Sequence, residues 1–323
     1  MKKKTIKWGI IGCGKIANKF ATDLATTKEA TLVAVASRNQ ENANAFAQKY
    51  GAKNAYNSYE TLANDIEVDA VYIATPHSFH RQHTLLCLQH KKAVLCEKPF
   101  AMNLEEVEKM IAVAKENNVL LMEALWTYFL PHYRCVLDIF KSKKYGELLE
   151  LKSDFGFKAM YNLESRLVKK EVGGGSLLDI GIYPIFTALS TLGNPEKIEA
   201  KATFFETGAD SSCDITFQYK NAKAYLKSTL LSDTNTEAIF TFENAEVKIN
   251  RMFHQPSTVT ITKDDNEETI DFDYKTIGYN FETEHFNQLL RENKTESDVM
   301  TFEFSRNLIK TLDEVRKIIG LEY

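Results

Sequence analysis

A short glycine-rich run near the start of the chain is the feature that most constrains its fold. An apolar segment ends at Ile11, and Gly12, Gly14 and Ala17 follow in the spacing G-x-G-x-x-A before a helical pattern. Where a strand passes directly into a helix, missing side chains let the backbone turn tightly and let its N–H groups approach a diphosphate. The run therefore predicts the first βα turn of a dinucleotide-binding fold. We expect five residues of this turn to contact the cofactor: Gly12, Cys13, Gly14, Lys15 and Ile16.

Up to about residue 124, short apolar runs rich in Val, Ile and Leu alternate with amphipathic stretches. This rhythm is typical of βαβ units, whose strands are buried on both faces of a parallel sheet. We therefore predict a Rossmann domain over residues 1–124. Its predicted strands are Ile6–Ile11, Thr31–Ala36, Ala70–Ala74, Ala93–Cys96 and Val119–Met122.

From residue 125 to residue 323 the pattern changes to longer segments that alternate apolar and polar residues. Such segments favour an open, mostly antiparallel sheet. Apolar stripes near 177–192, near 281–291 and at the end of the chain predict helices. The fold class is thus α/β, with a C-terminal α+β domain. Its predicted strands are Leu148–Phe157, Ile198–Phe205, Asp214–Tyr219, Ala224–Leu231, Ala238–Phe242, Val259–Thr262 and Thr269–Phe272.

The end of the second predicted strand bears on which dinucleotide binds. NAD-selective sites place an acidic residue there, because a carboxylate accepts hydrogen bonds from the adenine ribose and repels a 2′-phosphate. Here Ala36 is followed by Ser37 and Arg38. A hydroxyl and a guanidinium suit a 2′-phosphate. We therefore predict NADP(H) as the preferred cofactor, with NAD(H) possible.

Two further motifs supply candidate catalytic groups. Glu97, Lys98 and Pro99 follow a predicted strand, which puts a lysine at the carboxyl edge of the sheet, where ligands of such folds collect. Behind three glycines, Asp179 and Tyr183 lie four residues apart, so that in an α-helix they would share a face.

With these motifs the chain resembles the Gfo/Idh/MocA oxidoreductase family over nearly its whole length. It has G-x-G-x-x-A, the strand end 74–77 followed by His80, Glu97-Lys98-Pro99, and the D-x-G-x-Y helix, in family order. Within the family it is most similar to the dimeric dihydrodiol dehydrogenase and NADP-dependent D-xylose dehydrogenase group, through segments 36–38, 122–127, 154–157 and 178–183.

The resemblance implies roles for individual residues. Lys98 and Tyr183 become the catalytic pair, with Asp179 beside them, and a cis bond before Pro99 is implied. It also implies a homodimer, or a higher oligomer, formed through the C-terminal sheet. Besides the glycine turn, the implied cofactor contacts are Ser37, Arg38, Thr75, Pro76, His77, His80, Glu97 and Lys98, and the implied substrate contacts are Trp126 and Phe155.

The predicted reaction is hydride transfer between the nicotinamide and a hydroxyl or carbonyl carbon of a sugar, polyol or cyclic trans-diol. A phenol with a pKa near 10 needs a neighbouring cation to act as a base; whether Lys98 or Tyr183 carries the proton stays open. Inositol dehydrogenases of the family have histidine at the position of Tyr183, which weakens an inositol assignment. Tyr128 and His254 also replace an arginine and an indole of the most similar group.

Two alternatives remain from the sequence. The chain could bind NADP(H) as a sensor or scaffold without turnover, since fold alone does not establish catalysis. It could also be a hydrolase or dehydratase of the same fold that oxidises and re-reduces its substrate while the cofactor recycles in place.

Charge and composition exclude other classes of protein. The net charge of -4 and the scattered basic residues argue against nucleic acid as a partner. No run approaches the roughly 18 apolar residues of a membrane span, so we expect no membrane association and a cytoplasmic location. Five widely spaced cysteines without a C-x-x-C pair predict neither disulfides nor a metal site.

Overall fold

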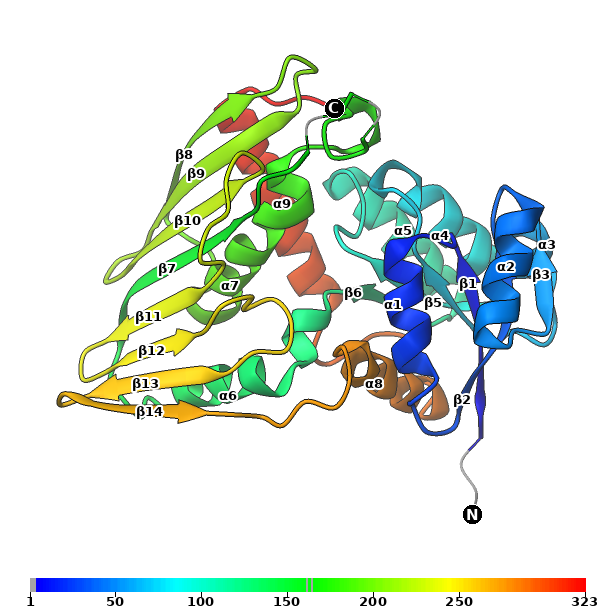
Figure 1. The fold of residues 1–323 in the computed structure, drawn as a ribbon, viewed down its shortest axis with the longest axis horizontal. Helices are drawn as coiled ribbons and strands as arrows, with labels where there is room; N and C mark the ends of the chain where they lie inside the picture. Colours follow the sequence, from blue (N-terminus) through cyan, green and yellow to red (C-terminus); the bar gives the residue numbers. More distant parts are fainter. Residues whose placement is uncertain (1–3, 161, 164) are drawn as a thin grey trace. The chain divides into compact units, whose positions relative to one another are not determined.

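The computed structural model describes residues 4–160, 162–163 and 165–323, and its contacts divide the chain into two units (Figure 1). The first unit contains the chain up to Trp126 together with Lys275–Arg306. The second contains Thr127–Tyr274 and Asn307–Tyr323. The predicted domain boundary at residue 124 did not assign residues 275–306 to the first unit. This assignment depends on contacts between segments that are far apart in the sequence.

The first unit is built on a six-stranded parallel sheet in the order β3-β2-β1-β4-β5-β6, as predicted for a Rossmann domain. Strand β3 was not predicted, because three residues are too short to show a period. The last strand starts at Leu121 rather than Val119, since the backbone N–H of Val119 still closes the preceding helix by bonding to Ala114. The elements are β1 (Ile6–Ile11), α1 (Lys15–Leu24), β2 (Ala30–Ala36), α2 (Gln40–Tyr50), β3 (Asn54–Tyr56), α3 (Tyr59–Asn64), β4 (Ala70–Ile73), α4 (His80–Gln89), β5 (Ala93–Glu97), α5 (Leu104–Asn117), β6 (Leu121–Ala124) and α8 (Tyr279–Arg291).

Helix α8 lies beside α1 and is fixed there by a buried carboxylate (Figure 1). Asp23, near the end of α1, accepts hydrogen bonds from the backbone N–H groups of Ile277, Gly278 and Tyr279 at 3.1, 2.7 and 2.8 Å. These N–H groups belong to the first residue of α8 and to the two residues before it, where no helical carbonyl can accept them. Asp23 therefore caps a helix that comes more than 250 residues later in the chain.

The second unit contains an eight-stranded sheet in the order β14-β13-β12-β11-β7-β10-β9-β8. Its pairs are antiparallel except for β7 with β10, which confirms the predicted mostly antiparallel sheet. Helix α6 and strand β12 were not predicted. The elements are α6 (Pro131–Lys141), β7 (Leu148–Gly156), α7 (Ile182–Leu192), β8 (Lys197–Phe204), β9 (Asp210–Gln218), β10 (Lys223–Thr229), β11 (Ala238–Phe242), β12 (Glu246–Ile249), β13 (Val259–Lys263), β14 (Asn266–Ile270) and α9 (Phe302–Ile319), whose first residues belong to the first unit.

The β13–β14 hairpin is tighter than predicted. Its turn consists of Asp264 and Asp265 alone, both with positive φ of 48° and 62°. Two-residue hairpin turns of this kind need positive φ at both positions, which aspartate tolerates better than most residues. Strand β14 therefore begins at Asn266, three residues before the predicted start.

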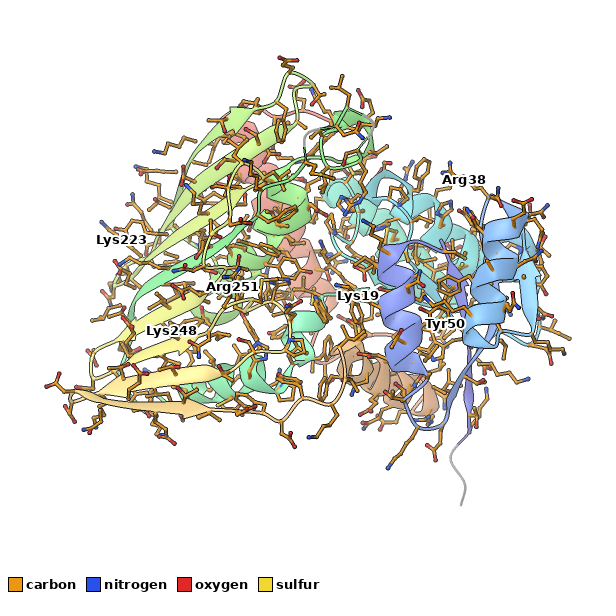
Figure 2. The ribbon with its side chains drawn as sticks, viewed as in Figure 1. Lys19, Arg38, Tyr50, Lys223, Lys248 and Arg251 are labelled. Carbon is orange, nitrogen blue, oxygen red and sulfur yellow. The ribbon has the colours of Figure 1, made fainter. Side chains whose placement is uncertain are left out.

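Helices α6 and α7 cover one face of the eight-stranded sheet, and the other face is open (Figure 1). Along β10, the side chains on the open face alternate with buried ones. Lys223 projects from this strand into solvent (Figure 2). Tyr225, two residues further along the same face, is 41% exposed.

The segment Lys170–Leu192 is long and apolar enough to cross a membrane by length and composition. The sequence prediction had found no such stretch, because it required an unbroken apolar run. Of its most apolar window, 94% is buried inside the structure. A core helix of a folded domain has this same composition.

Candidate active site

The glycine turn after β1 has the backbone conformation that its sequence predicts. Gly12 has a φ of +94°, and a Cβ atom placed there would lie 2.8 Å from the carbonyl oxygen of Ala74. Its own N–H donates to the carbonyl of Ala36 at 3.0 Å. The turn is thus held between the ends of β2 and β4, where only glycine fits.

The second glycine of the turn, Gly14, faces open space, unlike Gly12. A Cβ atom at Gly14 would meet nothing within 4 Å. Gly14 is the N-cap of α1, has no side chain to cap the helix, and is followed by a first turn without acidic residues. The N–H groups and the positive end of α1 are therefore available to an anion, which fits the diphosphate of a dinucleotide.

The side chain of Cys13, between the two glycines, packs against the end of β2. Its Sγ atom lies 3.7 Å from the carbonyl oxygen of Ala36. Burial raises the pKa of this thiol to about 11, so that it stays protonated near neutrality.

The end of β2 presents the residues predicted to select the cofactor. The backbone N–H of Ser37 donates to Tyr56 at 3.1 Å, and its Oγ accepts a hydrogen bond from the N–H of Asn39 at 3.4 Å. Arg38 is exposed at the start of the loop before α2 (Figure 2). Burial raises the pKa of the Tyr59 phenol, and the nearby guanidinium of Arg38 opposes that shift. Tyr59 was missed from the sequence because nothing in its spacing marks it.

Histidines join the end of β4 to the Glu97-Lys98-Pro99 turn. The Nε2 and Nδ1 atoms of His80 lie 2.8 Å from the carbonyl oxygens of Thr75 and Pro99, respectively. The Thr75 hydroxyl lies 3.0 Å from Nδ1 of His83, a residue that was not predicted. The Lys98–Pro99 bond is cis, as implied by the resemblance. His77 is also buried, and its ring centroid lies 5.7 Å from that of His80.

Glu97 ends β5 and is buried directly before Lys98. It accepts hydrogen bonds from the hydroxyl of Tyr72 and, at 3.2 Å, from the backbone N–H of Lys98. Its carboxylate is therefore fixed beneath the backbone of the turn that carries the lysine.

In the second unit, Asp179 lies on a π-helical turn, Leu177–Gly181, which leads into α7 with Tyr183 in its first turn. The expectation that both residues lie in one α-helix was therefore wrong. Asp210 of β9 explains how the turn is held. Its Oδ2 accepts hydrogen bonds from the hydroxyl of Ser176 at 2.6 Å and from the backbone N–H of Leu177 at 2.7 Å. Such π turns occur frequently at functional sites.

The Asp179 carboxylate is paired with a cation that was not predicted. Both terminal nitrogens of Arg166 lie 3.1 Å from one carboxylate oxygen of Asp179. The Asp179 side chain is 9% exposed, whereas that of Arg166 is 48% exposed. The ion pair thus connects a buried carboxylate with a guanidinium that is half exposed to solvent.

An aromatic cluster adjoins Tyr183 in the same unit. The ring centroid of Phe155 lies 5.7 Å from that of Tyr183 and 4.1 Å from that of His254, on which it stacks. Trp126 belongs to the first unit and stacks on Tyr279 with a centroid distance of 4.4 Å. The substrate contacts of Phe155 and Trp126 stay predictions.

The predicted catalytic residues are divided between the two units, with Lys98 in the first and Asp179 and Tyr183 in the second. Their pairing therefore stays a prediction. Among the residues that the structure describes, no group of three His, Cys, Asp or Glu side chains could hold a metal ion.

Comparison with known proteins identifies the family. Residues 6–125 match an oxidoreductase family with an NAD-binding Rossmann fold, and residues 133–248 match the GFO/IDH/MocA C-terminal domain. The chain therefore belongs to the Gfo/Idh/MocA family of oxidoreductases, as its motifs indicated, and it has the family's nicotinamide dinucleotide-binding fold.

Individual relatives span the whole chain. A trans-1,2-dihydrobenzene-1,2-diol dehydrogenase of Xenopus tropicalis is 35% identical and is covered over 99% of its length by 98% of this chain. An NADP⁺-dependent scyllo-inositol 2-dehydrogenase of Bacillus subtilis (strain 168) is 34% identical, with 98% of each chain covered. A 3-ketoreductase of Actinomadura kijaniata, solved with NADP and TDP-benzene, superposes with a TM-score of 0.88 at 25% identity over 98% of each chain.

The two glycines of the turn should respond differently to alanine. In Gly12→Ala the new Cβ meets the Ala74 carbonyl at a positive φ, so we expect the free energy of unfolding to fall by about 2 kcal/mol or more. In Gly14→Ala we expect a loss of about 1 kcal/mol or less, but weaker dinucleotide binding, because the methyl group enters the open space. Denaturant unfolding and NADPH fluorescence titration measure the two effects. Unchanged affinity in Gly14→Ala would contradict this position for the diphosphate.

Proposed function

We propose that this protein is an NADP(H)-dependent dehydrogenase or reductase that acts on a hydroxyl or carbonyl carbon of a sugar, polyol or cyclic diol. The observation that carries the proposal is the arrangement of the first unit. It has a glycine turn that fits a dinucleotide, and His80 contacts both the end of β4 and the turn that holds Lys98 at the carboxyl edge of the sheet. The relatives support the substrate class, since one is named for a cyclic diol and another for an inositol. Inositol, which Tyr183 disfavoured, therefore stays among the substrates to be tested.

The cofactor would be held by the N–H groups of the glycine turn and by Ser37 and Arg38. When bound, it supplies the hydride donor or acceptor. The side chains of the protein then bind the substrate oxygen and transfer its proton. In the oxidation direction Tyr183 or Lys98 takes the hydroxyl proton, and the ammonium of Lys98 favours an ionised phenol.

Asp179 has a separate part in this mechanism. Its carboxylate is buried but paired with Arg166, so its charge is neutralised within its own unit. It can thus orient a neighbouring hydroxyl or ammonium group without adding an uncompensated charge to the site. In the reduction direction the proton moves from Tyr183 or Lys98 to the substrate oxygen.

Removing either proton carrier should abolish the chemistry but not cofactor binding. We expect Tyr183→Phe and Lys98→Met each to lower kcat by about 10²- to 10⁴-fold, the range typical of lost acid–base catalysis. The measurement is cofactor absorbance with NADP⁺ against aldoses, inositols and trans-diols, with NADPH affinity measured in parallel. Wild-type turnover in either variant would refute its assigned role, and tight NADPH binding without turnover on any substrate would favour a sensor.

Arg38 should distinguish the two cofactors. A guanidinium that binds the 2′-phosphate contributes a charge-assisted hydrogen bond, whose loss typically weakens binding by about 10- to 100-fold. We therefore expect Arg38→Ala to weaken NADPH binding by that factor and to leave NADH binding nearly unchanged, as measured by titration of both. An equal loss for both cofactors would place Arg38 outside the 2′-phosphate site.

We also propose that two copies pair through the open face of the eight-stranded sheet. This face carries both signs of charge around Tyr225, including Lys227 and Asp214 at 2.9 Å, and so suits a second copy of itself. Sedimentation of the wild type should give the mass of two chains and Tyr225→Asp that of one. Ile66→Asp, which alters an apolar side chain that is 95% exposed in the other unit, is the control. A wild-type mass of one chain would overturn the proposal.

A further inference from the structure

A buried glutamate on α8 has no part in the mechanism described above. Glu282 is 0% exposed, and neither of its carboxylate oxygens has a hydrogen-bond partner. An ionised carboxylate in such a place would cost several kcal/mol, because it has lost its water and gained no donor. A protonated carboxyl avoids that cost. Burial first, and the charge of Glu97 second, raise the pKa of Glu282 well above its usual value.

The groups that face Glu282 come from several elements of the first unit. Tyr72 of β4 interacts electrostatically with Glu282, with Glu97 of β5 and with Tyr279 of α8, and Glu97 interacts with Glu282 as well. Glu123 of β6 also interacts with Glu97, whose charge raises the pKa of Glu123, and with Lys98, whose charge lowers it. Glu123 itself has a pKa of about 7, mainly through burial.

Hydrogen bonds decide which member of the pair carries the charge. Glu97 receives two donors, the hydroxyl of Tyr72 and the backbone N–H of Lys98, and both stabilise the ionised form. Glu282 receives none. The two carboxylates interact electrostatically, and like charges in a low-dielectric interior oppose each other's ionisation, so one proton remains on the pair. It remains on the carboxyl without donors.

We propose that Glu282 is a positioning residue for Lys98: it stays protonated in the working protein, so that the Glu97–Glu282 pair holds a single negative charge on Glu97, directly beneath the Lys98 backbone. Loss of the Glu282 proton to solvent at higher pH places a second negative charge beside Glu97. Repulsion then displaces the Glu97 carboxylate and weakens its hydrogen bond to the Lys98 N–H. The positioning role rests on the proposed function of Lys98, whereas the protonation state does not.

The first test is the pH dependence of stability in Glu282→Gln, whose amide mimics the protonated acid. Because the folded pKa is raised, the stability contributed by Glu282 is complete below its unfolded pKa of about 4.3 and is lost as the pH rises toward its folded pKa. Relative to the variant, the wild-type folding constant should fall by up to about tenfold per pH unit over that range. Glu284→Gln, the same change at an exposed position of α8, should keep the wild-type slope. Equal slopes in wild type and Glu282→Gln would overturn the proposal.

A second measurement covers the case in which Glu282→Gln fails to fold. Carbon-13 NMR of wild-type protein labelled at the glutamate carboxyl carbons should show one carboxyl that remains protonated at pH 8, after Glu123 has titrated. Ionisation of every glutamate by pH 8 would overturn the protonated Glu282.

The third measurement tests the positioning role. The wild-type kcat/KM should decline at alkaline pH as Glu282 ionises, and Glu282→Gln should lose that decline while Glu284→Gln keeps it. Identical profiles for wild type and Glu282→Gln would refute the positioning role. If the wild type has no turnover at all, the proposed function fails, while the stability and NMR results still decide the protonation state.

Discussion

The first unit depends on one buried carboxylate, that of Asp23. Its three hydrogen bonds to the start of α8 attach a late segment of the chain to the first helix of the Rossmann sheet. Helix α8 also contains Asn287 and Phe286. The side chain of Asn287 accepts a hydrogen bond from the indole N–H of Trp8 at 3.1 Å, and Phe286 packs on the same indole. The core of the sheet is therefore completed by residues that follow the entire second sheet in sequence.

The same return shapes the surroundings of the candidate catalytic lysine. Helix α8 brings Tyr279 against Phe20 and Trp126, and it brings Glu282 within electrostatic reach of Glu97, the residue before Lys98. The two ring nitrogens of His80 each lie within hydrogen-bond distance of a carbonyl oxygen, that of Thr75 and that of Pro99. Lys98 thus extends from a turn held by the carboxylate of Glu97 at the end of β5 and by the imidazole of His80 at the start of the preceding helix, α4. Rigid support of this kind keeps a catalytic group in place without a contact to the reacting atoms.

Sequence reasoning was most successful where local chemistry determines the structure. The turn at Gly12 was predictable because a positive φ and a close backbone approach leave no other residue type. It failed where distant segments decide the outcome. Residues 275–306 return to the first unit, where Asp23 of α1 caps the start of α8, and the π turn at Asp179 is held by Asp210 from a later strand. No spacing rule connects these partners.

The residues of the candidate site also fall into those that the sequence could predict and those that it could not. The motif residues could be assigned individually, but Arg166 could not, since a half-exposed arginine without periodic neighbours resembles any surface charge. Tyr59 and His83 were missed for a similar reason: each matters through its position beside Arg38 or Thr75, which only the folded sheet reveals. Short elements such as β12, with four residues, also carry too little pattern to be predicted.

The position of β7 in the second sheet has a consequence for how that unit folds. This strand joins two groups of sequential hairpins, β8-β9-β10 on one side and β11-β12-β13-β14 on the other. Each group can form from neighbouring segments, whereas β7 must wait for β10 and β11, which lie about 70 to 90 residues later. Closing such long loops is slow. During synthesis, β7 therefore emerges with both edges unpaired and stays so until β10 and β11 are complete, and an unpaired strand edge is open to pairing with another chain.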